Sequence, residues 1–178
     1  MGDYFQKIVD RDVSADEAPL LAEELRCWLV ERGIIEAVPS KDVADEPTYS
    51  PGAAYQSTLA VPNPHGTSGV NGLRIKVGRT VFWSIDTALT CGACGARFRP
   101  GDEWYDAADA WFAGDDLVTY SCPECGRPER LTEWIGEWPW GFGNLGLEFW
   151  NWTPLSDQFV REVSEKLGHR IVLIRGKL

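Results

Sequence analysis

The sequence predicts an α+β fold, a small mixed sheet with two helices and a C-terminal βαβ unit, into which a cysteine-rich module is inserted. Three observations lead to this prediction. Two segments carry apolar residues at helical spacing, several short segments alternate as strands do, and four of the five cysteines form two C-x-x-C pairs. We therefore expect one α+β domain made of residues 1–87 together with 131–178, and an inserted module at 88–130.

Residues 16–32, DEAPLLAEELRCWLVER, form the first expected helix. Leucines recur every four residues from Leu21 onwards and make one apolar stripe along the helix. Asp16 is the expected N-cap, and Gly33 follows the last turn as a C-capping residue does.

Residues 72–86, GLRIKVGRTVFWSID, alternate between apolar and polar side chains and predict extended structure. Two interpretations fit this pattern. Gly78 and Arg79 form a two-residue hairpin turn between two strands, or the segment is one long strand with a bulge at Gly78.

The C-terminal residues 146–175 predict a strand, a helix and a second strand. The first strand covers 146–152, the helix covers 154–167 with Thr153 as its cap, and the last strand covers 170–175. Tight links between the three elements favour a βαβ unit with a right-handed crossover.

Residues 36–71 are rich in proline and glycine and predict a long irregular connection, whose role as lid, docking segment or slack stays open. It contains His65, for which a solvated loop position is favoured. The other histidine, His169, directly follows the second helix, where contact with the last helical carbonyls is favoured over metal binding.

The strongest motif is the pair CGACG at 91–95 and CPECG at 122–126, which gives the pattern C-x2-C-x27-C-x2-C. Two cysteines three positions apart point at one ion when the chain turns tightly between them, and N–H groups of that turn can donate to the sulfurs. Gly95 and Gly126 each follow the second cysteine, where the turn requires an unusual backbone conformation. Four thiolates make a soft tetrahedral site that suits zinc, and they also suit iron.

These two turns, called knuckles below, resemble those of zinc-ribbon proteins over residues 88–130. In the first knuckle Gly92 stands where the zinc-ribbon pattern has proline. The resemblance implies that the zinc ligands are Cys91, Cys94, Cys122 and Cys125. The segment is also similar to rubredoxins, which hold iron in the same way, but Ala96 and Ser121 stand where rubredoxins have aromatic residues.

An acidic, aromatic segment lies between the knuckles. Residues 102–116 carry six acids, no bases and four aromatic residues, within a chain of net charge −10. Two interpretations fit: the rings face inward and the carboxylates are solvated, or the segment presents an anionic, ring-rich face to a basic protein. The strong acidity argues against nucleic acid as a partner.

A second aromatic segment, residues 133–152, carries five tryptophans. Core and inter-element packing is favoured for most of them, with Trp138 and Trp140 as the pair best placed for an exposed role. The candidate partner-binding residues are Asp106, Asp109, Trp111, Asp115, Asp116, Trp138 and Trp140.

A site with four thiolate ligands has no free position for a substrate, so we expect structural zinc and no catalytic residues. The expected function is that of a cytoplasmic, non-enzymatic zinc protein that binds another protein, for example as an inhibitor or immunity protein. No apolar run is long enough to cross a membrane, and no secretory signal opens the chain. The alternatives are an iron electron-transfer protein of the rubredoxin kind and a metal-dependent enzyme that uses His65 or His169.

Overall fold

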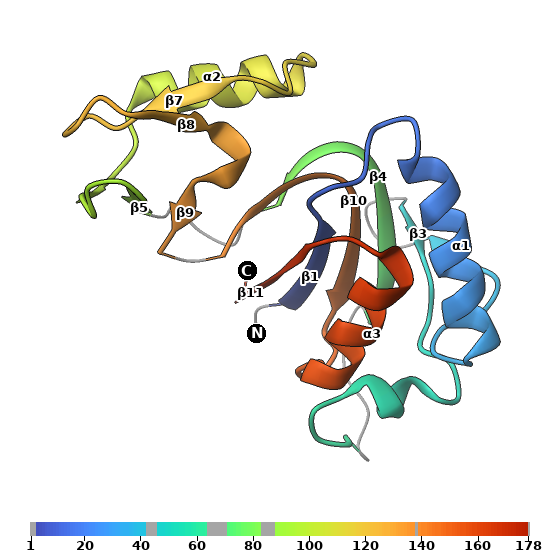
Figure 1. Ribbon diagram of the computed structural model, residues 1–178. Coiled ribbons are helices and arrows are strands. Elements are labelled where there is room, and N and C mark those ends of the chain that lie inside the picture. Colours follow the sequence, from blue (N-terminus) through green and yellow to red (C-terminus); the bar gives the residue numbers. More distant parts are fainter. Residues whose placement is uncertain (1–2, 42–45, 64–70, 83–87, 138, 178) are drawn as a thin grey trace.

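The computed structural model describes residues 3–41, 46–63, 71–82, 88–137 and 139–177. Within these ranges the chain forms three α-helices, two short 3₁₀ helices and eleven strands, so the predicted α+β class is confirmed (Figure 1). The helices are α1 (Ala18–Glu31), η1 (Tyr55–Thr58), α2 (Asp102–Phe112), η2 (Leu131–Glu133) and α3 (Asp157–Leu167). The strands are β1 (Tyr4–Asp10), β2 (Ser40–Lys41), β3 (Pro47–Thr48), β4 (Gly72–Phe82), β5 (Leu89–Thr90), β6 (Arg97–Phe98), β7 (Thr119–Ser121), β8 (Pro128–Arg130), β9 (Ile135–Gly136), β10 (Gly141–Trp150) and β11 (Ile171–Lys177).

The main sheet has the strand order β11-β1-β10-β4, and every neighbouring pair is antiparallel. Strands β10 and β11 therefore run parallel to each other with β1 between them. The predicted C-terminal βαβ unit is thus present in split form, as β10-α3-β11. A second split unit, β1-α1-β4, interlocks with it, and together they give the β-α-β-β-α-β connectivity of ferredoxin-like folds.

Strand β1 was not predicted from the sequence, because buried polar residues interrupt its apolar pattern. Gln6 and Asp10 are both buried on the side of the sheet that faces the helices. The Gln6 amide donates to the carbonyls of Trp152 and Thr153, and the Asp10 carboxylate accepts from backbone N–H groups. These hydrogen bonds offset the desolvation of the two side chains.

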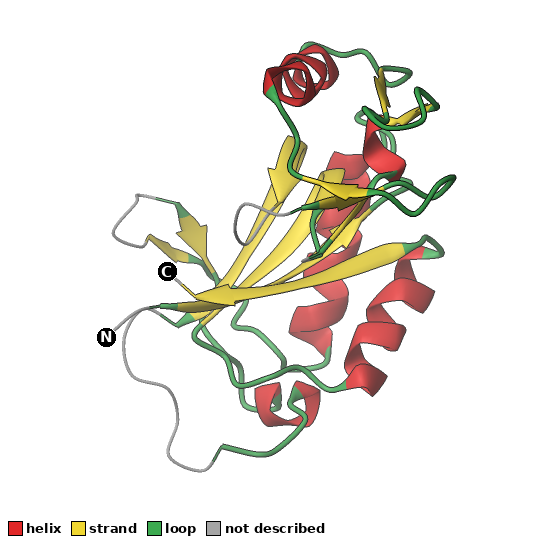
Figure 2. Cartoon of the chain, turned by 90° about the vertical axis from the view of Figure 1, so that its left-hand side faces the viewer, coloured by secondary structure: helices red, strands yellow, loops and turns green. Residues whose placement is uncertain are grey.

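Helices α1 and α3 cover the same face of the main sheet, as Figure 2 shows. The core that they share contains Leu25 and Leu29 of α1, Phe159 and Val163 of α3, and Ile8, Leu73, Leu145, Leu147 and Phe149 of the sheet. Each large apolar side chain that is fully buried there contributes about 2 kcal/mol to the stability of the fold.

None of the helices in the described ranges is both long and apolar enough to cross a membrane.

The segment around Gly78 is one long strand, β4, with a bulge, so the second of the two interpretations is correct. Val77 pairs with Leu145 and Thr80 pairs with Gly143, which leaves two residues of β4 opposite one residue of β10. Gly78 has a φ of 109°, which glycine adopts without strain. The expected extension to residue 86 falls partly on 83–87, which lie outside the described residues.

The cap of α3 is Ser156 and not the predicted Thr153. The Ser156 hydroxyl accepts a hydrogen bond of 3.1 Å from the N–H group of Phe159, and the helix begins at Asp157. Pro154 and Leu155 stay outside the helix because both are held elsewhere. The Pro154 carbonyl accepts from the N–H of Ala60, and the Leu155 N–H donates to the side chain of Gln6.

The alternation of side chains between the two faces of the sheet stops at the end of β10. Asn151 has a φ of 56°, in the left-handed region, and this reverses the side on which the next residue lies. Trp152 therefore packs against Phe149, with ring centroids 5.1 Å apart, in the core below the helices. Trp150 lies on the opposite face of the sheet, against Phe5.

Replacing Ser156 with alanine is expected to lower the free energy of unfolding by about 1 kcal/mol, because the Phe159 N–H loses its acceptor. Thr153→Ala is the matched control. The Thr153 hydroxyl is buried without a hydrogen-bond partner, so its removal is expected to change stability by less than about 0.5 kcal/mol. Urea unfolding followed by circular dichroism measures both values. A larger loss for Thr153→Ala would show that Thr153 is the cap.

Candidate metal centre

The two knuckles have the same backbone geometry. In the first, the Cys91 N–H donates to the Ala96 carbonyl and the Gly95 N–H donates to the Cys91 carbonyl, each at 2.9 Å. In the second, Cys122 makes the same two hydrogen bonds with residues 127 and 126, at 3.0 and 2.8 Å. Gly95 and Gly126 have φ values of 73° and 72°. The chain therefore builds the same metal-binding turn twice, as the spacing predicts.

The sulfur atoms of the four predicted ligands lie within 4.8 Å of one another. Two contacts join the knuckles: the Sγ atoms of Cys91 and Cys125 are 3.8 Å apart, and so are those of Cys94 and Cys122. Four sulfurs at about 2.3 Å from a central zinc ion stand about 3.8 Å apart at tetrahedral angles. The cluster therefore has the size of a tetrahedral metal site and can bind a metal ion.

Charge within the cluster also calls for a cation. Backbone N–H groups of Cys94 and Ala93 lower the pKa of Cys91 to about 7. The N–H of Ala96 acts in the same direction on Cys94, but burial and hydrogen bonds with the other three thiols outweigh it and raise the pKa of Cys94 to about 12. Full ionisation of all four sulfurs thus requires a positive ion among them. Zinc and iron both suit this donor set, since both accept four thiolates.

The cysteines belong to an aromatic core that is separate from the main one. Cys91 and Cys122 are buried in it, and Trp140 stacks on Trp104 with ring centroids 4.7 Å apart. This core extends beyond the predicted module boundaries at 88 and 130, since it includes residues of both long strands, β4 and β10. Its buried members are Leu89, Cys91, Trp104, Ala107, Trp111, Tyr120, Cys122, Leu131, Trp134 and Phe142, and Val81, Ala96, Phe98, Ala108, Val118 and Trp140 pack against them.

Helix α2 connects the two knuckles and was not predicted. Trp104, Ala107 and Trp111 form its buried face, at a spacing of three and four residues that is typical of a helix. Neither of the two interpretations of residues 102–116, inward rings or an anionic face, included a helix. The outer side of α2 carries Tyr105 and Phe112, which are 48% and 52% exposed and were not among the predicted site residues.

The predicted partner-binding residues are distributed unevenly. Asp106 and Asp109 are exposed on α2, and Asp115 and Asp116 are exposed in the loop that follows it. The Asp115 carboxylate accepts from the N–H of Leu117, and Asp116 forms a 2.6 Å ion pair with Arg79.

The three tryptophans of that predicted set differ from one another in exposure. Trp111 is only 3% exposed and contacts Phe142 inside the aromatic core, so it is not available to a partner. Trp140 is half-buried, and its ring N–H donates to the Trp134 carbonyl. Trp138 lies outside the described residues.

Polar contacts fasten the module to the main sheet. Arg11 donates to the Thr132 carbonyl at 2.8 Å and pairs with Glu133 at 3.1 Å, and Arg170 lies 3.6 Å from the same Glu133 carboxylate. On the other side of the junction, Arg79 donates to the carbonyl of Trp111. Residues from both ends of the chain thus hold the module in place.

His169 lies away from the cysteines and was predicted to contact helical carbonyls. Its Nδ1 is instead 2.8 Å from the carboxylate of Asp10, whose side chain is fully buried. His65 lies outside the described residues. Among the residues that the structure describes, the four cysteines are the only group of three or more metal-binding side chains close enough to share an ion.

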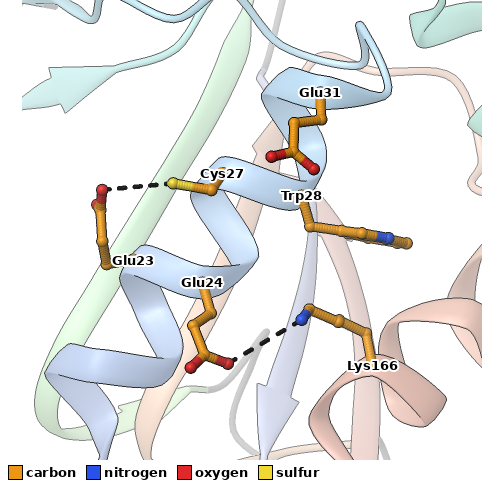
Figure 3. A pocket seen from close by; sticks show the side chains of 6 residues that line it. All are labelled: Glu23, Glu24, Cys27, Trp28, Glu31 and Lys166. Carbon is orange, nitrogen blue, oxygen red and sulfur yellow. Dashed lines mark hydrogen bonds and ion pairs between the residues drawn. The ribbon is translucent and has the colours of Figure 1, made fainter.

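The fifth cysteine lines a shallow groove between α1 and α3, which Figure 3 shows. The Cys27 thiol is 3.5 Å from the Glu23 carboxylate, and Lys166 lies 4.0 Å from Glu24 across the groove. Burial, together with the nearby Glu23, raises the pKa of Cys27. The raised pKa lowers the thiolate fraction of Cys27 at neutral pH, and the thiolate is the reactive form.

No family model, no curated protein and no solved structure matches this chain. The geometry of the four-cysteine cluster and of the helix between the knuckles therefore carries the functional argument.

Loss of the metal is expected to loosen the module. For an ion present at a thousandfold excess over its Kd, binding contributes about 4 kcal/mol, which corresponds to a fall in Tm of roughly 10 °C on removal. Elemental analysis and thermal melting of the full chain measure metal content and Tm, with a chelator or with Cys122→Ser as the perturbation. Cys27→Ser is the control and is expected to keep both. Unchanged melting after complete metal removal would show that the ion is not structural.

Replacing Glu23 with glutamine is expected to make Cys27 more reactive. The thiol then loses a nearby negative charge that disfavours its ionisation, so its pKa falls and the thiolate fraction at pH 8 rises. The rate of iodoacetamide labelling at Cys27, followed by mass spectrometry, is expected to increase several-fold. Glu31→Gln, in the same groove, is the control, because Glu31 is the smallest of the causes that raise this pKa. Equal rates in the two variants would contradict a specific effect of Glu23.

Proposed function

We propose that this chain is a zinc-stabilised protein-interaction module whose acidic helix α2 docks onto a basic protein. The observation that carries the proposal is the position of α2. Its buried face shares one aromatic core with two of the four cysteines, while its outer face is acidic and carries exposed rings.

Four sulfur ligands support a structural role for the ion. They fill a tetrahedral coordination shell, so no position is left for water or a substrate. Tyr120 lies two residues before Cys122, and its ring packs edge-on against Trp104 of α2 at 5.2 Å. Fixing the second knuckle with zinc therefore also fixes the position of α2.

The outer face of α2 is suited to a basic partner. The structure shows no ion pair or side-chain hydrogen bond for Asp102, Glu103, Asp106 or Asp109, in a segment of the described chain that holds no base. Unpaired carboxylates attract Lys and Arg of a partner and speed association. The exposed rings of Tyr105 and Phe112 offer apolar contact and cation–π stacking for the same side chains.

Asp106 and Asp109 thus stay in the proposed interface, and Tyr105 and Phe112 join them. Trp111 is buried and acts as an anchor of α2 from below. An inhibitor or immunity protein that masks a basic enzyme or toxin is one protein class with these properties.

The test is a comparison of two variants with the same net charge. Asp102→Asn, Asp106→Asn and Asp109→Asn together are expected to lower the recovery of a lysate partner at least tenfold, because about 1.4 kcal/mol of lost binding energy suffices. The control combines Asp16→Asn, Glu36→Gln and Glu165→Gln, which are exposed acids of the main unit, and is expected to bind as the unmodified chain does. The amount of partner recovered by each variant is measured by mass spectrometry at low and at high salt. Equal recovery by both variants would refute docking through α2.

Iron in the same cage is the second candidate, for electron transfer. The observation in its favour is that the sulfurs of Cys94 and Cys125 belong to exposed residues, which would bring a redox centre close to solvent. Metal analysis and an absorption spectrum of untagged protein separate the two. A coloured, iron-loaded chain with reversible one-electron reduction would replace the zinc proposal.

A further inference from the structure

The four sulfurs of the cluster differ in exposure in a regular way. The first cysteine of each knuckle, Cys91 or Cys122, is buried, and the second, Cys94 or Cys125, is exposed. The two 3.8 Å contacts each join an exposed cysteine of one knuckle to the buried cysteine of the other. An oxidant from solvent therefore meets a thiolate that has a second thiolate directly behind it.

We propose that the cluster is an oxidation site, at which hydrogen peroxide converts the metal ligands into two disulfides between the knuckles, Cys91–Cys125 and Cys94–Cys122, with release of the metal. This inference rests on the proposed zinc site. Zinc itself has no redox chemistry, so all electrons come from sulfur.

The reaction balances at each pair of cysteines. The exposed thiolate attacks peroxide, so that a sulfur–oxygen bond forms and the oxygen–oxygen bond breaks. Hydroxide departs, and the cysteine has become a sulfenic acid. The buried thiolate then attacks the sulfenic sulfur, the disulfide forms, and a second hydroxide leaves. Each pair thus gives two electrons to one peroxide, and about two peroxides consume all four ligands and free the ion.

The geometry favours bonds between the knuckles. A disulfide is about 2.05 Å long, so each pair of sulfurs has to approach by roughly 1.8 Å. The hydrogen bonds that hold each turn join backbone atoms only, so a rotation of the cysteine side chains does not have to break them. The resulting bonds join the same two turns that the metal joins, so α2 keeps its place after the metal has gone.

Cys27 is an internal reference for this chemistry. It lies on α1, outside the cluster, with Glu23 and Arg26 as its polar neighbours and, among the described residues, no second sulfur in contact. It has no resolving partner within the chain and is expected to remain a thiol when the cluster is oxidised.

The experiment treats the zinc-loaded full chain with increasing hydrogen peroxide. Zinc release is followed with a chromogenic chelator, and disulfides are mapped without reduction. Trypsin separates the knuckles into residues 80–97 and 98–130, so bonds between them link two peptides, whereas a bond within one knuckle leaves that peptide unlinked. The linked peptides are then fragmented in the mass spectrometer. Backbone cleavage between the two cysteines of each knuckle identifies which cysteine is bonded to which.

The expected result is complete zinc release at about two equivalents of peroxide, with Cys91–Cys125 and Cys94–Cys122 formed and Cys27 still free. Oxidised protein is expected to melt within a few degrees of the zinc-loaded form and well above the reduced, zinc-free form. A thiol reductant with added zinc is expected to restore the starting state. Disulfides within single knuckles, sulfinic or sulfonic acids, or zinc retained at tenfold excess peroxide would overturn the inference.

The zinc proposal is tested separately in the same series. If the untreated chain binds no metal, the zinc proposal fails, and peroxide treatment of that metal-free chain still tests the disulfide pairs by the same map. If the untreated chain binds zinc but the pairs do not form, only the oxidation inference fails. Cys27→Ser repeats the measurement without the fifth thiol and is expected to leave every result unchanged.

Discussion

The close packing of four cysteine sulfurs is the constraint on which the rest of the module depends. The sulfurs lie within 4.8 Å of one another, so ionising all of them without a cation is costly, while a central metal ion turns the same proximity into attraction. Because Cys91 and Cys122 are also buried members of the aromatic core, the electrostatic centre and the apolar packing of the module occupy one place. This centre belongs to the same core as α2, the short strands and the tryptophans of the module.

The two long strands of the main sheet explain how the module is held without a large interface of its own. One end of each strand lies in the core below α1 and α3. The other end lies in the aromatic core, where Val81 of β4 and Phe142 of β10 pack. Phe142 contacts three tryptophan rings, at centroid distances of 5.1 to 6.2 Å. The two cores therefore share strands, so two continuous strands join the module to the main sheet.

Charge is distributed differently in the two parts. In the main unit several acids have partners: Glu148 pairs with Lys7, Glu162 with Arg32 and Asp12 with Arg170. On α2, the structure shows four acids without such partners. The proposed partner binding therefore depends on these four unpaired carboxylates of α2.

Much of the local structure could be predicted from short-range patterns. Leucine spacing predicted α1, and the paired C-x-x-C turns identified the residues that the fold brings into one cluster. The choice of Ser156 over Thr153 as a cap could not be read from the sequence. It depends on Gln6 and on the Pro154 carbonyl contact with Ala60, both distant in sequence.

Local sequence is enough to specify the chemistry of the cysteine site, because a knuckle is a short turn whose residue types and spacing set its geometry. Which side chains face solvent depends instead on long-range packing. α2 turns Trp111 inward and Tyr105 and Phe112 outward because the aromatic core lies on one side of it. Long-range packing also places β1 between β10 and β11, since strand order is set by the burial of whole faces and not by any single segment.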